Sequence, residues 1–246
     1  MQKPKMILFD YGQTLVNEKK FDAIKGNEAV LSIATKNPEN ITAHELQQQV
    51  NRVFKESQRI QESNRHEQLL EINCKGFDTY VYESLGLEFD VDMEEVQGKF
   101  WDNATLEWAE PTEGIEELLA YLQENNIRTG VISNMMNSSG LLKRRIDTLI
   151  PQNWFEFYLA SNSYLFRKPH PFIFEMATKK AKLKPEEIWF CGDNLLCDIE
   201  GAFNFGMKPV FYPTYIDCEY SVDTKVPYME IGSWKELIEY IRCGGN

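Results

Sequence analysis

The sequence has a deficit of basic residues and no long apolar run. Its 246 residues include 26 Lys and Arg against 38 Asp and Glu, so the formal net charge at pH 7 is −12. A chain this acidic lacks the basic surface that nucleic acids and anionic membranes require, so we expect neither as a partner. An anionic substrate must therefore be attracted locally, by a metal ion or by a single placed lysine.

The lack of a long apolar run also argues against a membrane span, which needs roughly 18 consecutive apolar residues. The N-terminal segment MQKPKMILFD does not have the layout of a signal peptide, because its short apolar run meets Asp10 at once. The five cysteines are scattered, with no CxxC pair and no Cys/His cluster of zinc-binding spacing. We therefore expect reduced thiols and a cytoplasmic protein.

The most informative stretch that is present is residues 6–15, MILFDYGQTL. Residues 6–9 are apolar throughout, as in a parallel strand that is covered on both faces. The run ends at Asp10, and Gly12 and Thr14 follow. Open parallel sheets bind ligands at the carboxyl ends of their strands, so Asp10 is a candidate site residue. Taken alone, the segment is more easily explained as a strand followed by an ordinary turn.

The remainder of the chain consists of a helical block and an alternating region. Residues 21–105 show helical periodicity and hardly any strand signal. Thr42 and Glu45 form a capping-box pattern there. The predicted helices of this block cover residues 21–35, 42–54, 68–85 and 92–103.

From residue 111 onward, predicted helices and strands alternate. The strands cover residues 127–132, 155–160, 188–191, 208–212 and 228–231, and the helices residues 112–125, 138–149, 171–183, 198–205 and 233–242. This spacing indicates a parallel sheet with helices on both faces, to which strand 6–9 also belongs. We predict an α/β fold with a doubly wound parallel sheet. Its core domain comprises residues 1–17 and 106–246, and an all-helical cap domain, residues 18–105, is inserted above the carboxyl ends of the strands as a lid.

Polar residues lie at or beyond the ends of four predicted strands. Each group alone is an ordinary turn, loop or helix cap, but a parallel sheet brings the ends of its strands to one edge. Together, and in this order, they predict a site there. The groups are Asp10 with Thr14, Ser133 with Asn134, Lys168, and Asp193 with Asp198.

This arrangement resembles the haloacid dehalogenase (HAD) superfamily, which consists mostly of phosphatases and other phosphoryl-transfer enzymes. The resemblance covers essentially the whole chain, including the helical insertion and the run PTEGIEELLAYLQENNIRTGVISN. It implies Asp10 as the nucleophile, Ser133 as a phosphoryl-binding residue and Mg²⁺ as the cofactor. The site residues implied are Asp10, Ser133 and Lys168 for catalysis, Thr14, Ser133, Asn134 and Lys168 for substrate binding, and Asp10, Gly12, Asp193 and Asp198 for the metal.

The chemistry of these residue types supports the implied roles. An aspartate that attacks phosphorus forms an aspartyl phosphate and splits one difficult displacement into two. Mg²⁺ prefers carboxylate, water and phosphate oxygens, and Lys168 supplies a compact positive charge. The expected function is that of a magnesium-dependent phosphatase acting on a small phosphorylated metabolite. No pattern in the sequence indicates an oligomeric state.

The sequence departs from the family motif at one position. The motif is Asp-x-Asp-Gly-Thr, whereas residues 10–14 read Asp-Tyr-Gly-Gln-Thr. In the family's phosphatases the second Asp protonates the leaving group and later activates water. Gly12 can do neither, and loss of a general acid–base typically costs about 10²–10⁴-fold in rate. Its backbone carbonyl can still bind the metal.

Three hypotheses follow from Gly12, in order of preference. The protein acts on phosphates with good leaving groups, such as acyl or aryl phosphates, which need little protonation. Alternatively, Gln13, Glu18 or the substrate itself replaces the missing acid. In the third hypothesis, turnover has been lost and the protein binds a phosphorylated ligand or a partner.

Two other reaction classes also lack the second Asp. Haloacid dehalogenases use the same aspartate on carbon without a metal, but Asp193 and Asp198 favour phosphorus over carbon. Phosphonate-cleaving relatives use a cap lysine as a Schiff base. Lys19, Lys20 and Lys25 lie near the start of the predicted cap, although surface lysines are common.

Overall fold

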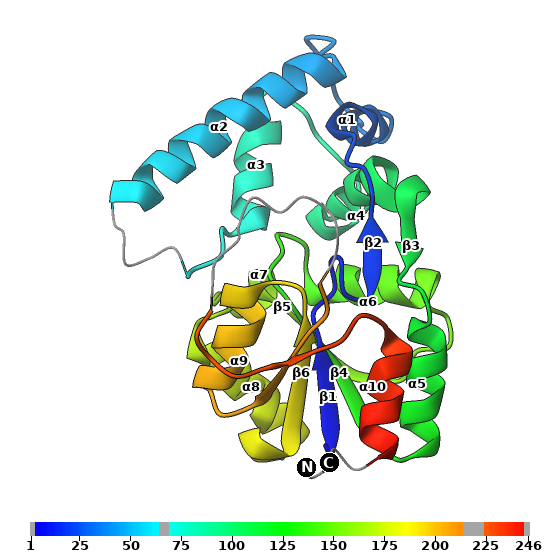
Figure 1. Cartoon of the computed structure of the whole chain (residues 1–246). Helices are drawn as coiled ribbons and strands as arrows, with labels where there is room; N and C mark the ends of the chain where they lie inside the picture. The colour runs from blue at the N-terminus through cyan, green and yellow to red at the C-terminus, as the bar shows by residue number, and fades with distance from the viewer. Residues whose placement is uncertain (1–2, 64–68, 214–223, 244–246) are drawn as a thin grey trace.

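A computed structural model of the chain describes residues 3–63, 69–213 and 224–243, apart from the side chains of residues 58–63. Its main sheet has six strands in the order β5-β4-β1-β6-β7-β8, and all neighbours run parallel (Figure 1). The strands are β1 (Met6–Phe9), β4 (Arg128–Ser133), β5 (Phe155–Ala160), β6 (Ile188–Gly192), β7 (Lys208–Phe211) and β8 (Met229–Glu230).

The central strand β1 is apolar at every position because both of its faces are covered. All four of its residues are fully buried, and Phe9 lies opposite Val131 of β4 and Cys191 of β6. Ile7 and Phe9 belong to the hydrophobic cluster on one face, and Met6 and Leu8 to the cluster on the other. The predicted doubly wound parallel sheet is therefore confirmed.

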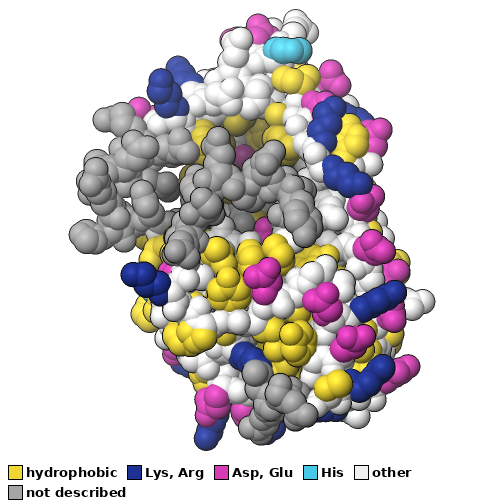
Figure 2. All heavy atoms as spheres, in the orientation of Figure 1, with side chains coloured by type: hydrophobic (Ala, Val, Ile, Leu, Met, Phe, Trp, Pro, Cys, Tyr) yellow, Lys and Arg dark blue, Asp and Glu magenta, His cyan; other side chains and the backbone are white. Residues whose placement is uncertain are grey.

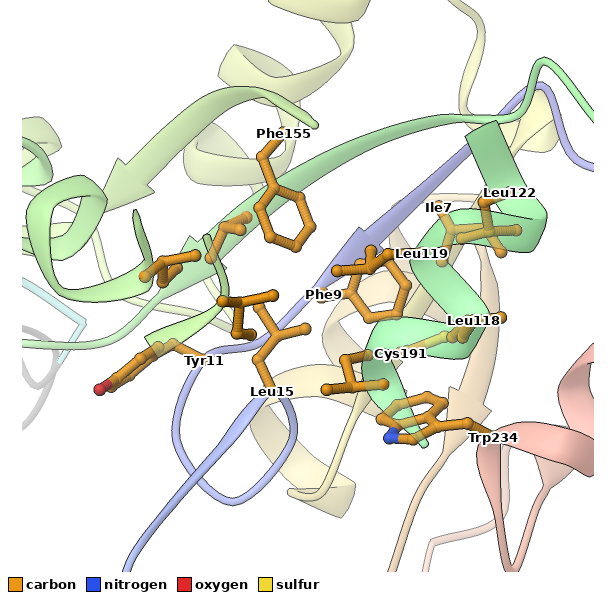
Figure 3. Packing of buried hydrophobic residues seen from close by; sticks show 14 of the residues in the cluster. Ile7, Phe9, Tyr11, Leu15, Leu118, Leu119, Leu122, Phe155, Cys191 and Trp234 are labelled. Carbon is orange, nitrogen blue, oxygen red and sulfur yellow. The ribbon is translucent and has the colours of Figure 1, made fainter. Parts of the chain in front are cut away.

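Helices pack on both faces of this sheet. α5 (Ile115–Glu124), α6 (Ser139–Leu149) and α10 (Trp234–Arg242) contribute to the cluster that contains Phe9. The Phe9 ring meets the ring of Trp234 edge to face at 5.8 Å, beside Leu118 and Leu119 of α5 (Figure 3). α8 (Pro171–Ala181) covers the other face, with the short helices α7 (Ser161–Tyr164) and α9 (Gly201–Asn204) on the same side.

The inserted segment forms a separate helical layer above the carboxyl edge of the sheet (Figure 1). Its helices are α1 (Ala23–Leu31), α2 (Ala43–Ser63), α3 (Cys74–Ser84) and α4 (Met93–Thr105). They have their own core, which includes Val30, Leu46, Val81 and Val96. The helical insertion predicted from the sequence is therefore present, and we call residues 18–105 the cap.

A short antiparallel ribbon connects the cap to the sheet. It pairs β2 (Val16–Glu18) with β3 (Ala109–Pro111), which follows the 3-10 turn η1 (Leu106–Trp108). The sequence did not predict these strands, because three residues are too few to show a period. The predicted boundary at residues 17/18 falls within β2, and the one at 105/106 falls between α4 and η1. The division into two domains stays a prediction.

Local signals placed most of the helix starts. The Asp92, Ser138 and Ser233 side chains each accept a hydrogen bond from the backbone three residues later. The capping box is formed, since Thr42 and Glu45 bind one another's backbone N–H groups.

Several predicted helices start or end elsewhere, and α2, for example, continues to Ser63. The helix predicted for residues 112–125 begins at Ile115, because the Thr112 hydroxyl binds the backbone oxygen of Thr14 instead. The predicted helix 198–205 is a π-helical turn, η3 (Leu195–Glu200), followed by α9. The predicted helix 68–85 begins only at Cys74, and residue 68 lies outside the described residues.

The described surface carries charges of both signs. On the face drawn in Figure 2, Lys and Arg side chains are dispersed among Asp and Glu and do not gather into a basic patch. None of the described helices is long and apolar enough to cross a membrane.

Candidate active site

One cavity lies where the cap meets the carboxyl edge of the sheet. Its volume is about 710 Å³, within the usual range for small-molecule sites. Side chains of both the cap and the sheet line it. Every site residue predicted from the sequence lines it except Thr14: Asp10, Gly12, Ser133, Asn134, Lys168, Asp193 and Asp198.

Lys168 lies at the centre of the polar end of this cavity. Its Nζ donates to Asp10 Oδ1 at 2.6 Å, to Asp198 Oδ1 at 2.6 Å and to the Ile132 backbone oxygen at 3.1 Å. All three donors of the ammonium group are therefore used, and the side chain is only 3% exposed. Burial alone would lower the pKa of Lys168, but the two carboxylates outweigh burial and raise it, so the amine stays charged.

Three carboxylates surround this single cation. Oxygens of Asp10, Asp193 and Asp198 lie within 4.8 Å of one another, and we call these residues the acidic cluster. Burial raises the pKa of Asp10 to about 6, with Lys168 opposing and Asp198 adding to the effect. Burial, then Asp10 and Asp198, raise the pKa of Asp193 to about 8. Negative charge thus exceeds positive charge in the cluster.

The acidic cluster fits a hard divalent cation. Its ligand atoms are all oxygens, as Mg²⁺ prefers, and a cation would relieve the repulsion that raises the two pKa values. Asp198 is held by Lys168 at Oδ1 and by the Asn194 backbone N–H, 3.0 Å away, at Oδ2. Its carboxylate also lies so close to Gly192 that a Cβ there would approach within 2.3 Å, so the position requires glycine.

Ser133 and Asn134 take different places at the end of β4. Ser133 is the last residue of the strand and lines the cavity. The Asn134 side chain donates to the Lys168 backbone oxygen at 2.9 Å and accepts from the Lys168 backbone N–H at 2.7 Å. Asn134 therefore fixes the backbone of the lysine, and its predicted role in substrate binding stays a prediction.

Thr14 is fully buried, and the structure does not bring it into the cavity wall. Its hydroxyl has no hydrogen-bond partner among the described residues, while its backbone oxygen accepts from Thr112 at 2.8 Å. Its predicted role in substrate binding also stays a prediction.

Comparison with known proteins identifies the family. Residues 7–212 match the model of the haloacid dehalogenase-like hydrolases. The chain belongs to this family. A glyceraldehyde 3-phosphate phosphatase from Pyrococcus furiosus is 27% identical over 252 residues, covering 97% of this chain and 95% of that protein.

Solved structures of this family share the fold. A 2-haloacid dehalogenase from Pseudomonas syringae has a TM-score of 0.61 at 20% identity, covering 99% of both chains. The HAD-hydrolase YfnB from Bacillus subtilis, solved bound to magnesium, has a TM-score of 0.55 at 17% identity and covers 98% of this chain and 99% of its own. At these identities the likeness establishes the fold alone, so the reaction must be argued from the site.

The position of Gly12 is open to a side chain. A Cβ built on this residue meets no atom within 4 Å, and the residue lines the cavity. The space that a second aspartate would occupy in this HAD chain is therefore present.

Gln13 and Glu18 are the two side chains considered as replacements for the missing general acid. Of these, only Glu18 lines the cavity. Glu18 Oε1 accepts from the Tyr11 hydroxyl at 2.8 Å and from Arg145 at 2.9 Å. The Gln13 Oε1 atom is buried without a hydrogen-bond partner in the described chain. Neither arrangement presents a free proton donor to the cavity.

The lysines considered for a Schiff base lie away from the cavity. Lys19 and Lys25 form ion pairs, and Lys20 lies over an aromatic ring, all with residues 107–110. None of the three lines the cavity, so the geometry gives the phosphonate-cleaving alternative no support.

Sequence reasoning missed the cap side of the cavity. Asn27, Gln47, Asp78 and Gln97 line it, together with aromatic side chains. Asp78 occupies the same face of α3 as Cys74, Phe77 and Tyr82, and all four line the cavity. A carboxylate on an otherwise apolar helix face was the signal that could have identified this wall.

A buried arginine links the cap to the core. Arg145 of α6 is 2% exposed and pairs with Glu18 of the ribbon at 2.9 Å and with Asp102 of α4 at 3.0 Å. It also donates to the Thr105 hydroxyl at 2.8 Å and stacks on the Trp101 ring at 3.9 Å. We call these five residues the Arg145 cluster.

A second contact joins the cap to the loop that carries Lys168. Backbone hydrogen bonds of 2.7 Å run from Glu71 N–H to the Leu165 oxygen and from Arg167 N–H to the Leu69 oxygen. The Glu71 carboxylate accepts from Arg167 at 2.5 Å and from the Ser161 hydroxyl. We call residues 69–72 the strap.

Proposed function

We propose that this haloacid dehalogenase-like hydrolase is a magnesium-dependent phosphatase that acts on a small phosphorylated metabolite through an aspartyl phosphate on Asp10. The observation that carries the proposal is the acidic cluster around Lys168. Attack on carbon needs the nucleophile alone, whereas Asp193 and Asp198 add carboxylates that are useful only beside a cation. That a relative with 27% identity is a glyceraldehyde 3-phosphate phosphatase supports the same reaction.

In the first step, a carboxylate oxygen of Asp10 attacks phosphorus, and the bond from phosphorus to the ester oxygen breaks. Lys168 keeps Asp10 ionised and oriented through the 2.6 Å contact at Oδ1. Ser133 donates a hydrogen bond to the transferring group, whose charge spreads over its equatorial oxygens. Asp10, Asp193, Asp198 and the Gly12 carbonyl would hold Mg²⁺, which would supply positive charge beside the incoming phosphate.

In the second step, water attacks the aspartyl phosphate. The bond between phosphorus and the Asp10 oxygen breaks, so inorganic phosphate leaves and the carboxylate is restored. The cap closes the cavity and limits the access of other water.

Gly12 shapes which esters react well. It offers no proton to the leaving oxygen, so substrates whose leaving group is stable as an anion react fastest. Acyl and aryl phosphates meet this condition, and an alkyl phosphate must supply the proton from its own neighbouring hydroxyl or from water. Glyceraldehyde 3-phosphate carries such a hydroxyl and is the first natural candidate to test.

A magnesium-dependent screen tests the proposal. We would measure phosphate release from acetyl phosphate, p-nitrophenyl phosphate and glyceraldehyde 3-phosphate, with Mg²⁺ and with EDTA, and use Asp10→Asn as the control. The proposal predicts turnover that requires both Mg²⁺ and Asp10. Absence of release from every ester would favour a ligand-binding protein, and chloride release from 2-chloropropionate in EDTA would favour a dehalogenase.

A further inference from the structure

The two ends of the cavity differ in charge. Among the described lining residues, the cations are Lys168 and Arg167, both at the sheet end. Lys168 is fully committed to its three acceptors, and Arg167 is paired with Glu71. The described cap wall therefore presents no free positive charge to a ligand.

Asp78 is the one carboxylate on the helical part of this wall in the described chain. Its Oδ2 accepts from Gln97 Nε2 at 2.7 Å and from Cys74 Sγ at 3.2 Å. Its Oδ1 accepts no hydrogen bond from the described chain. Asp78 lines the cavity, so this oxygen is open to a ligand that donates a hydrogen bond.

The remaining polar groups of the helical wall include the hydroxyls of Tyr82 and Thr105 and neutral amides, three of which hold one another. Asn27 Nδ2 donates to Gln47 Oε1 at 2.8 Å, and Gln47 Nε2 donates to Asn51 Oδ1 at 2.9 Å. This chain fixes the amide orientations and cannot offset a second anion on a substrate. Asp78 therefore decides the charge preference of the wall.

We infer that Asp78 selects phosphate esters whose end remote from the phosphate carries a hydrogen-bond donor, a hydroxyl or an ammonium group, and rejects esters whose remote end is an anion. The inference rests on the proposed function for the presence of a phosphate at the sheet end. A donor completes the free Oδ1 atom, whereas an anion meets a like charge without any free cation of the described wall to compensate.

The test compares two esters of similar size that differ at the remote end. Glycerol 3-phosphate presents hydroxyl groups, and 3-phosphoglycerate presents a carboxylate. We expect kcat/KM to favour glycerol 3-phosphate by about tenfold or more, the ratio that one charge-assisted hydrogen bond supplies. In Asp78→Asn this ratio should fall towards one, because the substitution keeps the size of the side chain and removes its charge.

Glu83→Gln is the matched control, since Glu83 lies on the same helix, is exposed and does not line the cavity. It should leave the ratio unchanged. Equal kcat/KM values for the two esters in the wild-type protein, or an unchanged ratio in Asp78→Asn, would overturn the inference. If acetyl phosphate is not turned over with Mg²⁺, the proposed function fails instead, and the ratio is then measured as dissociation constants of the two esters by calorimetry on the wild-type protein.

Discussion

Two cations are almost completely buried in the described chain, and each is shared by two carboxylates. Lys168 pairs with acids of the sheet edge, and Arg145 pairs with acids of the ribbon and α4. One therefore lies where the chemistry is proposed to occur and the other where the cap joins the core. The pairing is alike, but the consequences differ.

The difference lies in what completes each cluster. Around Lys168 the further group is Asp193, a third carboxylate, so negative charge is in excess and the cluster fits a metal ion. Around Arg145 the further groups are the Thr105 hydroxyl and the Trp101 ring, which add no charge. An ion pair with one surplus acid forms a candidate metal site, whereas an ion pair completed by neutral groups forms a structural link.

The largest expected effect comes from replacing Asp10, the proposed nucleophile that pairs with Lys168. Asp10→Asn should lower kcat for acetyl phosphate on the order of 10⁴-fold or more, the scale seen when a nucleophile is lost. Phosphate release under single-turnover conditions measures this. Circular dichroism should show an unchanged fold, since Asn retains the shape of the side chain. Retention of more than a tenth of the rate would refute Asp10 as the nucleophile.

A second test adds a carboxylate to the cavity beside the Lys168 cluster, at position 12. Gly12→Asp has room for its side chain. It should raise the rate on alkyl phosphates by about 10²-fold, the lower end of the effect of a general acid–base. The rate on p-nitrophenyl phosphate should rise much less, because its leaving group needs no proton. An equal gain on both substrates would count against the explanation given for Gly12.

Replacing Arg145, the other buried cation, should lower the free energy of unfolding more than it lowers the catalytic rate. Arg145→Met leaves Glu18 and Asp102 without their shared partner, and we expect about 3 kcal/mol of destabilisation, the lower end for a broken buried pair. Urea unfolding measures it. Lys143→Met on the same helix removes an exposed pair with Asp147 and a 5.7 Å contact with the Tyr158 ring, and it should cost less than about 1 kcal/mol. Similar losses in the two variants would remove the distinction between a buried link and a surface pair.

The excess of carboxylates in the acidic cluster should also make the stability of the metal-free protein depend on pH. The pKa values of Asp10 and Asp193 are raised to about 6 and about 8, so the metal-free folded state binds more protons than the unfolded state between about pH 4 and pH 8. Stability in EDTA should therefore fall as the pH rises through that window. Mg²⁺ competes with these protons, so the increase in Tm on adding it should be several degrees larger at about pH 8 than at about pH 5.

Asp193→Asn removes one of the two titrating groups and is the control for this measurement. It should reduce the difference between the two pH values. A Mg²⁺-induced increase in Tm that is independent of pH would argue against a surplus of charge in the acidic cluster.

The sequence predicted that the residues around Lys168 lie together, but it did not predict the Arg145 cluster, and the reason is physical. Strand ends are marked locally, because an apolar run stops at a polar residue, and a parallel sheet then collects them. Arg145 follows Lys143 and Arg144, and nothing in the sequence distinguishes it from these exposed neighbours. Only the packing of the cap on α6 buries it. The strap and the wall around Asp78 depend in the same way on contacts between distant segments.

Because of the strap, the cap is attached to the core at two places, the ribbon and the loop that carries Lys168, and not at the ribbon alone. Lifting the cap has to bend the ribbon and also separate Glu71 from Arg167, the residue next to Lys168. The lysine itself is held from the sheet, because the Asn134 side chain binds both its backbone N–H and its backbone oxygen. Detaching the strap therefore costs the Glu71–Arg167 ion pair and two backbone hydrogen bonds, but it does not require Lys168 to leave Asp10.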